Sequence, residues 1–322
     1  MFILFNHLLN EINRRDKFLF VCHRNPDPDT VGSALALGTF IESLGKKADY
    51  FCIDKIPNNF LFLKNADCFS GDAVMFLNNY DAVIFVDCAE MSRCGVQNVP
   101  RKEGQIWISV DHHLLRENFA DIEVRDQRAS ATAEIIYKFF LHIGAKINCD
   151  MATALLSGIL IDTSFLSNAA ASNESIRISG ELSSLGADYR CIVRAFYMNK
   201  NPKMLKLWGL ALSRLKYNEE KGMATTALFL EDVEECVELD DASSGLSSFL
   251  SATLKYNIIM VFEGKKDGIK GSLRTVKDDI NVAKLAAEYG GGGHAKAAGF
   301  LCAGKLIETE NEWIVEKNEQ EA

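Results

Sequence analysis

Short apolar runs that each end in polar residues are the feature that most constrains the fold of this chain. They occur at 18–22 (FLFVC), 48–53 (ADYFCI), 81–90 (DAVIFVDCAE) and 105–113 (QIWISVDHH). The segments 29–45, 129–144 and 151–162 have the apolar spacing of helices, and Gly45 closes the first of them. Continuous apolar strands that alternate with helices are typical of a parallel sheet buried on both faces. We therefore predict an α/β fold with a parallel sheet for the first half of the chain.

The polar residues at the ends of these segments form a candidate metal site. In an open parallel sheet the carboxyl ends of the strands lie at one edge, where ligands bind. The candidate metal ligands are His23, Asp27, Asp29, Asp87, His112 and Asp162. Any single Asp after a strand is often only a helix N-cap, and Asp29 has that alternative. Because four separate segments bring His or Asp to one edge, we favour a metal site, with enough ligands for two ions if one carboxylate bridges them.

The donor types indicate which ions such a site prefers. Oxygen-rich ligation with two imidazoles favours manganese first, with magnesium or cobalt as alternatives, over a thiolate zinc site. Two ions about 3.5–4 Å apart can acidify a bridging water and neutralise a phosphoryl oxygen. The site is therefore suited to hydrolysis of phosphate esters.

The second half of the chain predicts a smaller domain of different composition. Residues 190–216 carry seven basic residues and no acidic one, and Pro202 marks a helix start within them. Strands are expected in 222–230, 256–264 and 268–276, and a helix in 281–290 leads into the glycine cluster GGGGHAKAAGF. We expect a catalytic domain at 1–189, a basic helical linker at 190–216 and a substrate-binding α/β domain at 217–322. The acidic tail after Glu308 is expected to be solvated or frayed.

Composition and charge exclude several classes of protein. No apolar run approaches the roughly 18 residues of a membrane-spanning helix. Residues 1–17 lack the basic start and cleavage site of a signal peptide and predict an amphipathic helix. The nine cysteines include no Cys-x-x-Cys pair, which argues against disulfides and structural zinc. The net charge of −9 disfavours coating of long nucleic acid but permits binding of a short nucleotide. We expect a cytoplasmic protein that does not bind membranes.

With these residues assembled, the chain resembles the DHH-type phosphoesterases. The matching motifs are HRNPDPD, VDCAE, DHH and GILIDT, in that order, and the glycine cluster resembles the signature of the family's DHH-associated C-terminal domain. The chain is most similar to the short two-domain members, which are nanoRNases that also dephosphorylate 3′-phosphoadenosine 5′-phosphate (pAp).

The resemblance implies a role for each candidate residue of the first domain. His23 and Asp27 would bind one metal ion, Asp29, His112 and Asp162 the other, and Asp87 would bridge the two. Asp111 would orient His112 through its second ring nitrogen. His113 would face the scissile phosphate as an electrostatic stabiliser or as proton donor to the leaving oxygen.

The resemblance also implies a substrate-binding set in the second domain. Backbone N–H groups of Gly291, Gly292 and Gly293, which permit close approach of a phosphate or base, would act with His294, Arg274 and Ser272. Arg116 replaces an Asn that family members commonly have after the DHH triplet, and it is either a phosphate contact or a surface charge. The segment after Asp162, TSFLSNAAASNES, also departs from the family pattern. Both departures bear on substrate preference.

The function that these patterns predict is manganese-dependent hydrolysis of short RNA or DNA oligonucleotides to mononucleotides, and of pAp to AMP. A cleft between the two domains would limit substrate length, and the basic linker would attract anions. A cyclic- or linear-dinucleotide phosphodiesterase is the alternative within phosphoesterases. An inorganic pyrophosphatase is disfavoured by the glycine–His signature, and a processive RecJ-like exonuclease by the absence of room for a further domain. A nucleotide-binding regulator is the alternative of another class, and a homodimer is left open.

Overall fold

The computed structural model of the chain describes residues 1–97, 99–114, 117–198, 201–234, 245–277 and 279–316. The chain forms two compact units, Met1–Asn199 and Lys200–Ala322. The boundary between them lies inside the 190–216 segment. Arg116, one of the expected substrate contacts, lies outside the described residues.

The first unit is built on a six-stranded parallel sheet. Its strands, in the spatial order β3-β2-β1-β4-β5-β6, are Phe69–Ser70, Lys47–Phe51, Lys17–Val21, Ala82–Val86, Ile106–Asp111 and Ile122–Arg125. Every pair in this sheet is parallel. The central strands β1 and β4 are buried at almost every position, which explains why they appear in the sequence as continuous apolar runs. The predicted parallel sheet is confirmed.

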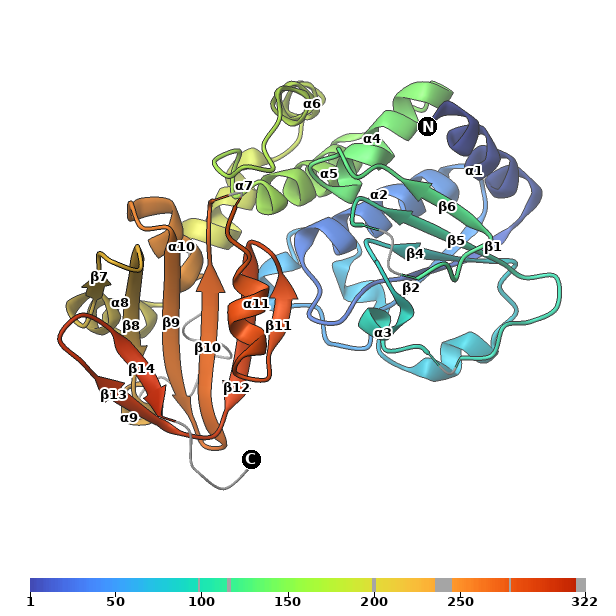
Figure 1. Ribbon diagram of the computed structural model, residues 1–322. Coiled ribbons are helices and arrows are strands. Elements are labelled where there is room, and N and C mark those ends of the chain that lie inside the picture. The colour runs from blue at the N-terminus through green and yellow to red at the C-terminus, as the bar shows by residue number, and fades with distance from the viewer. Residues whose placement is uncertain (98, 115–116, 199–200, 235–244, 278, 317–322) are drawn as a thin grey trace. The chain divides into compact units, whose positions relative to one another are not determined.

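Helices cover one face of this sheet, and shorter segments cover the other (Figure 1). The main helices are α1 (Phe2–Arg14), α2 (Pro28–Ser43), α4 (Thr132–Ile143), α5 (Cys149–Asp162) and α6 (Asn173–Ser184). On the opposite face, the short helix α3 (Met91–Cys94) and the 3-10 segment Ala73–Leu77 close a second core around Phe85 and Trp107. The amphipathic first helix predicted for residues 1–17 is confirmed as α1, which buries Phe5, Leu8 and Ile12.

Helices α2 and α5 approach each other closely because glycines face the contact. A Cβ added at Gly32 would lie 2.3 Å from the backbone oxygen of Ala154, and one added at Gly158 would lie 2.6 Å from Oδ1 of Asp29. Real side chains do not reach such distances, so only glycine fits at either position. The contact joins the start of α2, which carries Asp27 and Asp29, to the helix that ends at Asp162.

The first unit ends with α7 (Tyr189–Val193) and a π-helical turn (Arg194–Met198). The second unit opens with α8 (Pro202–Ser213), which begins at Pro202 as predicted. Its mixed sheet has the order β11-β12-β10-β9-β8-β7, formed by Gly292–His294, Ala297–Cys302, Gly268–Arg274, Ile258–Lys265, Met223–Leu228 and Lys216–Asn218. Helices α9 (Leu230–Glu234), α10 (Leu246–Thr253) and α11 (Val282–Ala287) complete the unit.

The expectation of a frayed tail after Glu308 was wrong for residues up to 316. The strands β13 (Lys305–Glu308) and β14 (Trp313–Glu316) form an antiparallel pair. Trp313 is buried, and its ring nitrogen donates to the carbonyl oxygen of Arg214 over 2.8 Å. One buried aromatic anchors this segment despite the acidic residues around it. In the described part of the chain, no helix has the length and apolarity to span a bilayer.

Candidate metal centre

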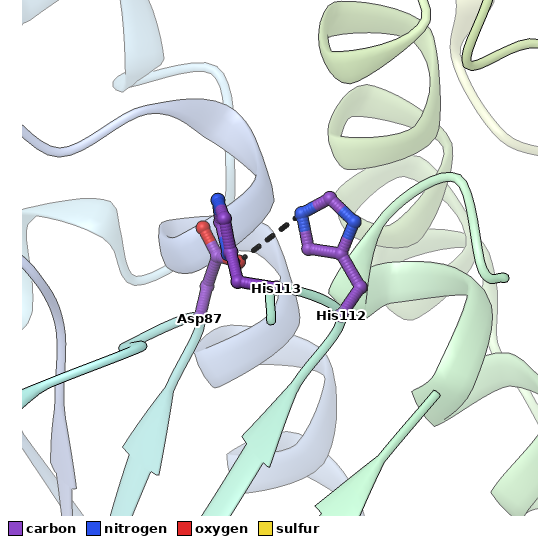
Figure 2. A group of neighbouring side chains, drawn as sticks. All are labelled: Asp87, His112 and His113. Carbon is purple, nitrogen blue, oxygen red and sulfur yellow. Dashed lines mark ion pairs between the residues drawn. The ribbon is translucent and has the colours of Figure 1, made fainter. Parts of the chain in front are cut away.

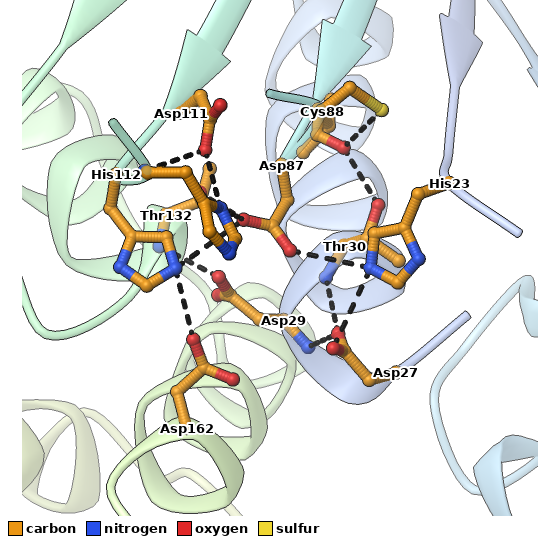
Figure 3. Close-up of polar contacts among 12 residues, drawn as sticks. His23, Asp27, Asp29, Thr30, Asp87, Cys88, Asp111, His112, Thr132 and Asp162 are labelled. Atoms are coloured by element: carbon orange, nitrogen blue, oxygen red, sulfur yellow. Dashed lines mark hydrogen bonds and ion pairs between the residues drawn. The ribbon is translucent and has the colours of Figure 1, made fainter. Parts of the chain in front are cut away.

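The candidate ligands meet where the strand order of the first sheet reverses direction. From β1 the chain builds outward through β2 and β3, and it then returns to β4 on the other side of β1. Neighbouring strands that lead away in opposite directions leave a crevice at their carboxyl ends. His23 follows β1, and Asp87 follows β4 directly. Figure 3 shows Asp87 between His23 and His112, with Asp27, Asp29 and Asp162 around them.

One group of possible ligand atoms comprises His23, Asp27 and Asp87. Nε2 of His23 lies 3.5 Å from Oδ2 of Asp27 and 3.4 Å from Oδ2 of Asp87. Its Nδ1 is 2.7 Å from the carbonyl oxygen of Arg24. Because a carbonyl oxygen only accepts, Nδ1 carries the proton, and in the neutral ring Nε2 presents a lone pair to the two carboxylates.

A second group comprises Asp29, His112 and Asp162. Nε2 of His112 lies 3.2 Å from Oδ2 of Asp162 and 3.5 Å from Oδ1 of Asp87. Its Nδ1 is 3.3 Å from the carbonyl oxygen of Ala129, which fixes the same tautomer as in His23. The two oxygens of Asp87 therefore face different groups, Oδ2 toward His23 and Oδ1 toward His112.

Asp87 occupies a backbone conformation that few residues adopt. Its φ is 60°, in the left-handed region, where a non-glycine residue costs roughly 1–3 kcal/mol. Its N–H donates to the carbonyl oxygen of Val110 over 2.9 Å, and Oγ1 of Thr132 donates to its Oδ1 over 2.9 Å. These contacts hold the carboxylate in place at the carboxyl end of β4.

The electrostatics of the cluster favour added positive charge. Burial alone would lower the pKa of His23, but Asp27 and Asp87 raise it to about 12. Burial likewise opposes protonation of His112, yet Asp162 and Asp87 raise its pKa to about 10. Burial raises the pKa of Asp162 to about 6, and it raises that of Asp29 well above the usual range, with Asp162 and Asp87 adding to the effect. These shifts show that the carboxylates favour positive charge among them, which either protonated imidazoles or bound cations can supply.

A pair of divalent ions fits this donor set. Nε2 of both His23 and His112 is buried without a hydrogen-bond partner. The separations of 3.2–3.5 Å between ring nitrogens and carboxylate oxygens resemble the about 3 Å expected for ligands at right angles around an ion with bonds near 2.1 Å. Carboxylate and imidazole donors suit manganese or magnesium, and no thiolate joins either group. The assignment of each residue as a ligand stays a prediction.

The N-cap alternative for Asp29 applies instead to its neighbour. Asp27 caps α2, since its Oδ1 accepts from the N–H groups of Asp29 and Thr30, which leaves Oδ2 facing His23. Asp29 accepts from the N–H groups of Thr132 and Ala133, over 2.7 and 2.9 Å, at the start of α4. This buried carboxylate thus holds the first turn of α4 as well as facing the second ligand group.

The expected pairing of Asp111 with His112 was wrong. Oδ1 of Asp111 lies 2.9 Å from Nδ1 of His113 and accepts the N–H of His113 over 2.9 Å, whereas His112 is oriented by Ala129. Residues two apart along a strand point to the same side, which pairs Asp111 with His113. Figure 2 shows the His112 and His113 rings beside the Asp87 carboxylate, and both approach its Oδ1. Although burial opposes it, Asp111 and Asp87 raise the pKa of His113 to about 9.

The segment after Asp162, which departs from the family pattern, makes a left-handed turn. Ser164, Phe165 and Leu166 have φ values of 48°, 58° and 63°. Left-handed residues cost about 1–2 kcal/mol each, so the surrounding contacts must offset this strain. The side-chain amide of Asn168 donates to the carbonyl oxygen of Asp162 over 2.9 Å, and the ring of Phe165 packs on that of Tyr197. The turn fixes the end of α5, where Asp162 lies.

Comparison with known proteins identifies the family. The sequence model of the DHH family N-terminal domain matches residues 17–159, and that of the DHHA1 domain matches residues 228–315. A relative from Thermus thermophilus, named bifunctional oligoribonuclease and PAP phosphatase NrnA, is 31% identical over 301 residues, which cover 93% of this chain and 88% of the relative. The chain belongs to the DHH family.

Two further comparisons agree with this assignment. The Bacillus subtilis protein of the same name is 25% identical over 297 residues and covers 91% of each chain. The crystal structure of an exopolyphosphatase-related protein from Bacteroides fragilis matches with a TM-score of 0.88 at 24% identity, and covers 94% of this chain and 92% of that one. The resemblance stated from the sequence motifs is therefore confirmed, as is the fold class of a parallel-sheet domain followed by a second α/β domain.

The expected substrate-binding residues of this DHH protein lie in two rows across the second sheet. Ser272 on β10 pairs with Gly299 on β12, which pairs with Gly292 on β11. Two residues along, Arg274 pairs with Ala297, which pairs with His294. Residues two apart on a strand share a face. The sheet therefore brings Ser272, Arg274, Gly292 and His294 to one face, with only small residues between them on β12.

These four residues form a strip on the second sheet. The other two expected glycines, Gly291 and Gly293, are required by the backbone beside this strip. Gly293 has φ 145°, and a Cβ at Gly291 would lie 2.2 Å from the backbone oxygen of Gly299. Burial lowers the pKa of Arg274, whose guanidinium contacts Oγ of Ser248 and the carbonyl oxygen of Leu273. Among the described residues, no carboxylate pairs with it. An arginine held in this way is suited to binding an anion.

Two residues that contact the candidate site of this DHH protein were not expected from the sequence. Thr132 donates to Asp87, and Arg125 contacts Asp111. Thr132 lies in the first turn of the helix predicted at 129–144, near the ligand edge of the sheet, so its position could have drawn attention. Arg125 carried no such signal, because β6 was not among the predicted strands.

Proposed function

We propose that this DHH protein hydrolyses short oligonucleotides to mononucleotides and also removes phosphate from pAp, with two divalent ions, manganese foremost. The observation that carries the proposal is the Asp87 carboxylate, whose two oxygens face two separate His–Asp groups. When bound, two ions would neutralise phosphoryl oxygens and acidify the attacking water. His23, Asp27 and Asp87 would hold one ion, and Asp29, His112, Asp162 and Asp87 the other.

The chain's own residues would handle the leaving group. Nδ1 of His113 lies between Oδ1 of Asp111, at 2.9 Å, and Oδ1 of Asp87, at 3.2 Å. Both carboxylates engage this nitrogen, so Nε2 is the one available to donate to a phosphate oxygen. The His113 side chain is 30% exposed, so a substrate can reach it. We assign it as general acid or electrostatic stabiliser.

Substrate recognition is assigned to the second unit. Arg274 and His294 lie on either side of Ala297, two strands apart and thus about 10 Å from each other along the row. Glycine and alanine between them leave the backbone open to a flat base or a sugar-phosphate. We propose that this strip binds the nucleotide away from the scissile bond, and that residues 190–216 link a catalytic domain at 1–189 to a substrate domain at 217–322.

A hydrolysis panel on the full chain tests the proposal. RNA of two to about 24 nucleotides, the range that a short-oligonucleotide enzyme must discriminate, would be compared with pAp, pGpG, cyclic di-AMP and pyrophosphate, each with manganese. We expect fast loss of the shortest RNAs and of pAp. Asp87→Ala should abolish both activities, whereas Asp16→Ala, which removes an acid whose side chain is 86% exposed, should not.

Each other outcome of the panel points to a different function. Preference for cyclic di-AMP or pGpG would make the protein a signalling phosphodiesterase. Binding of these nucleotides without turnover of any of them would refute hydrolysis in favour of a regulator. Activity that survives in Asp87→Ala would refute the assigned site, whatever the substrate.

A further inference from the structure

Arg125, at the end of β6, is enclosed by polar acceptors beside the DHH triplet. Its Nη1 lies 2.5 Å from Oδ2 of Asp111 and donates to the carbonyl oxygen of His113 over 2.9 Å. Its Nη2 lies 3.0 Å from Oε2 of Glu123 and 3.4 Å from Oγ of Ser109. Only 9% of the Arg125 side chain is exposed. Together these contacts hold the guanidinium in one orientation.

The contacts of Arg125 lead to His113 along two routes. Through the side chains, Arg125 binds one oxygen of Asp111, and the other oxygen binds Nδ1 of His113. Through the backbone, Arg125 binds the carbonyl oxygen of His113 itself. The Asp111 side chain is fully buried. Without Arg125 this buried carboxylate would keep only His113 as a charged partner, and breaking a buried ion pair is strongly destabilising.

We propose that Arg125 is a positioning residue that sets the orientation of the His113 ring through Asp111, an inference that rests on the proposed hydrolysis. The planar fork of arginine reaches the Asp111 carboxylate and the His113 carbonyl with the same nitrogen while it holds Glu123 with the other. Lysine would keep the charge but offers a single point of donation. The guanidinium is a support for the ring and does not itself contact substrate.

A purely structural role for Arg125 would give a different result. Its pair with Glu123, on the same strand, would then matter as much as its pair with Asp111, and loss of either would reduce stability without a specific effect on turnover. The two roles separate when kcat, KM, the free energy of unfolding and the protonation site of the His113 ring are measured on the same variants.

The test uses full-length Arg125→Lys and Arg125→Met, with Arg128→Met as matched control, since the side chain of Arg128 is 91% exposed. We expect Arg125→Met to lower kcat on a dinucleotide by about 10–100-fold, as for other lost supporting contacts, with KM little changed. Arg125→Lys should recover part of the loss, and Arg128→Met should behave as wild type. In NMR of the magnesium form, the Nδ1–H proton of His113, assigned with His113→Gln, should be lost or exchange-broadened in Arg125→Met.

The NMR signal decides the inference even if hydrolysis fails. If the wild type cleaves no substrate, the proposed function falls, while an Nδ1–H signal that depends on Arg125 still supports the positioning role. If Arg125→Met does not fold, Arg125→Lys carries the test. An unchanged Nδ1–H signal in the folded variant, or a variant with wild-type kcat, would overturn the inference.

Discussion

Replacing Gly158 with alanine tests whether the close contact of α5 with α2 positions Asp29. An added Cβ would lie 2.6 Å from Oδ1 of Asp29 and 2.9 Å from Cβ of Ala133. Over-packing of this kind costs about 1–3 kcal/mol, whereas alanine in place of glycine gains about 0.5–1 kcal/mol in a helix. We expect a net loss of about 1–2 kcal/mol, which lowers Tm by about 2–8 °C in a unit of this size.

The same substitution should weaken metal binding, because the displaced carboxylate faces the second ligand group. We expect manganese affinity to fall by about 10-fold or more, measured by titration calorimetry, with stability measured by urea unfolding. Gly180→Ala is the matched control, since α6 offers an added Cβ no neighbour within 4 Å, and it should be slightly stabilising. If Gly158→Ala matched Gly180→Ala in stability and bound manganese like the wild type, the contact would not position Asp29.

Three further predictions follow from individual contacts. Thr132→Val removes the hydrogen bond to Oδ1 of Asp87 and should lower the free energy of unfolding in urea by about 1–3 kcal/mol, while Thr132→Ser should stay near wild type. Equal losses in the two variants would show that this hydrogen bond does not stabilise the fold. Manganese at 100 times its Kd should stabilise the wild type by about 2.7 kcal/mol for each ion bound, reversibly with EDTA, and should leave Asp87→Ala much less affected. An equal gain in both proteins would place the ions elsewhere. In the second unit, the hydrogen bond from Arg214 holds the pKa of Asp232 below its usual value, so this pair stabilises the fold above the unfolded pKa of about 3.9 and the contribution is lost as pH falls through the lower folded value. Asp232→Asn should therefore lower stability at pH 7 but not at the acid limit, as measured by urea unfolding at both pH values.

The meeting of the candidate metal ligands could be expected from the sequence because these residues follow strongly apolar runs. β1, β4 and β5 are buried almost throughout, so their limits were clear, and parallel strands bring their carboxyl ends to one edge. The two edge strands, β3 and β6, have too few buried residues to be recognised by this pattern. Because β6 was not predicted, Arg125 at its end was not recognised either.

The partners of individual side chains were harder to predict than the set of residues that lie together at the candidate site. The partner of Asp111 depends on which side of an extended segment each imidazole points to, and adjacent histidines are equivalent in a motif. Capping of α4 by Asp29 joins residues about 100 positions apart, beyond the local spacing that capping rules describe. The burial of Trp313 depends on its contacts with residues far along the chain, including Arg214, and not on the acidic residues beside it.

The order in which the ligands occur along the chain has a consequence for biosynthesis. His23 lies near the start of the first unit, whereas Asp162 ends α5, the fifth of its α-helices. A ribosome adds about 5–20 residues per second, so an emerging chain presents His23, Asp27 and Asp29 for many seconds before α5 is made. During that interval the early carboxylates have no complete site and are exposed to whichever ions the cell contains in excess. If the candidate ligands hold an ion, the ion that stays is therefore selected late, when α5 packs against α2.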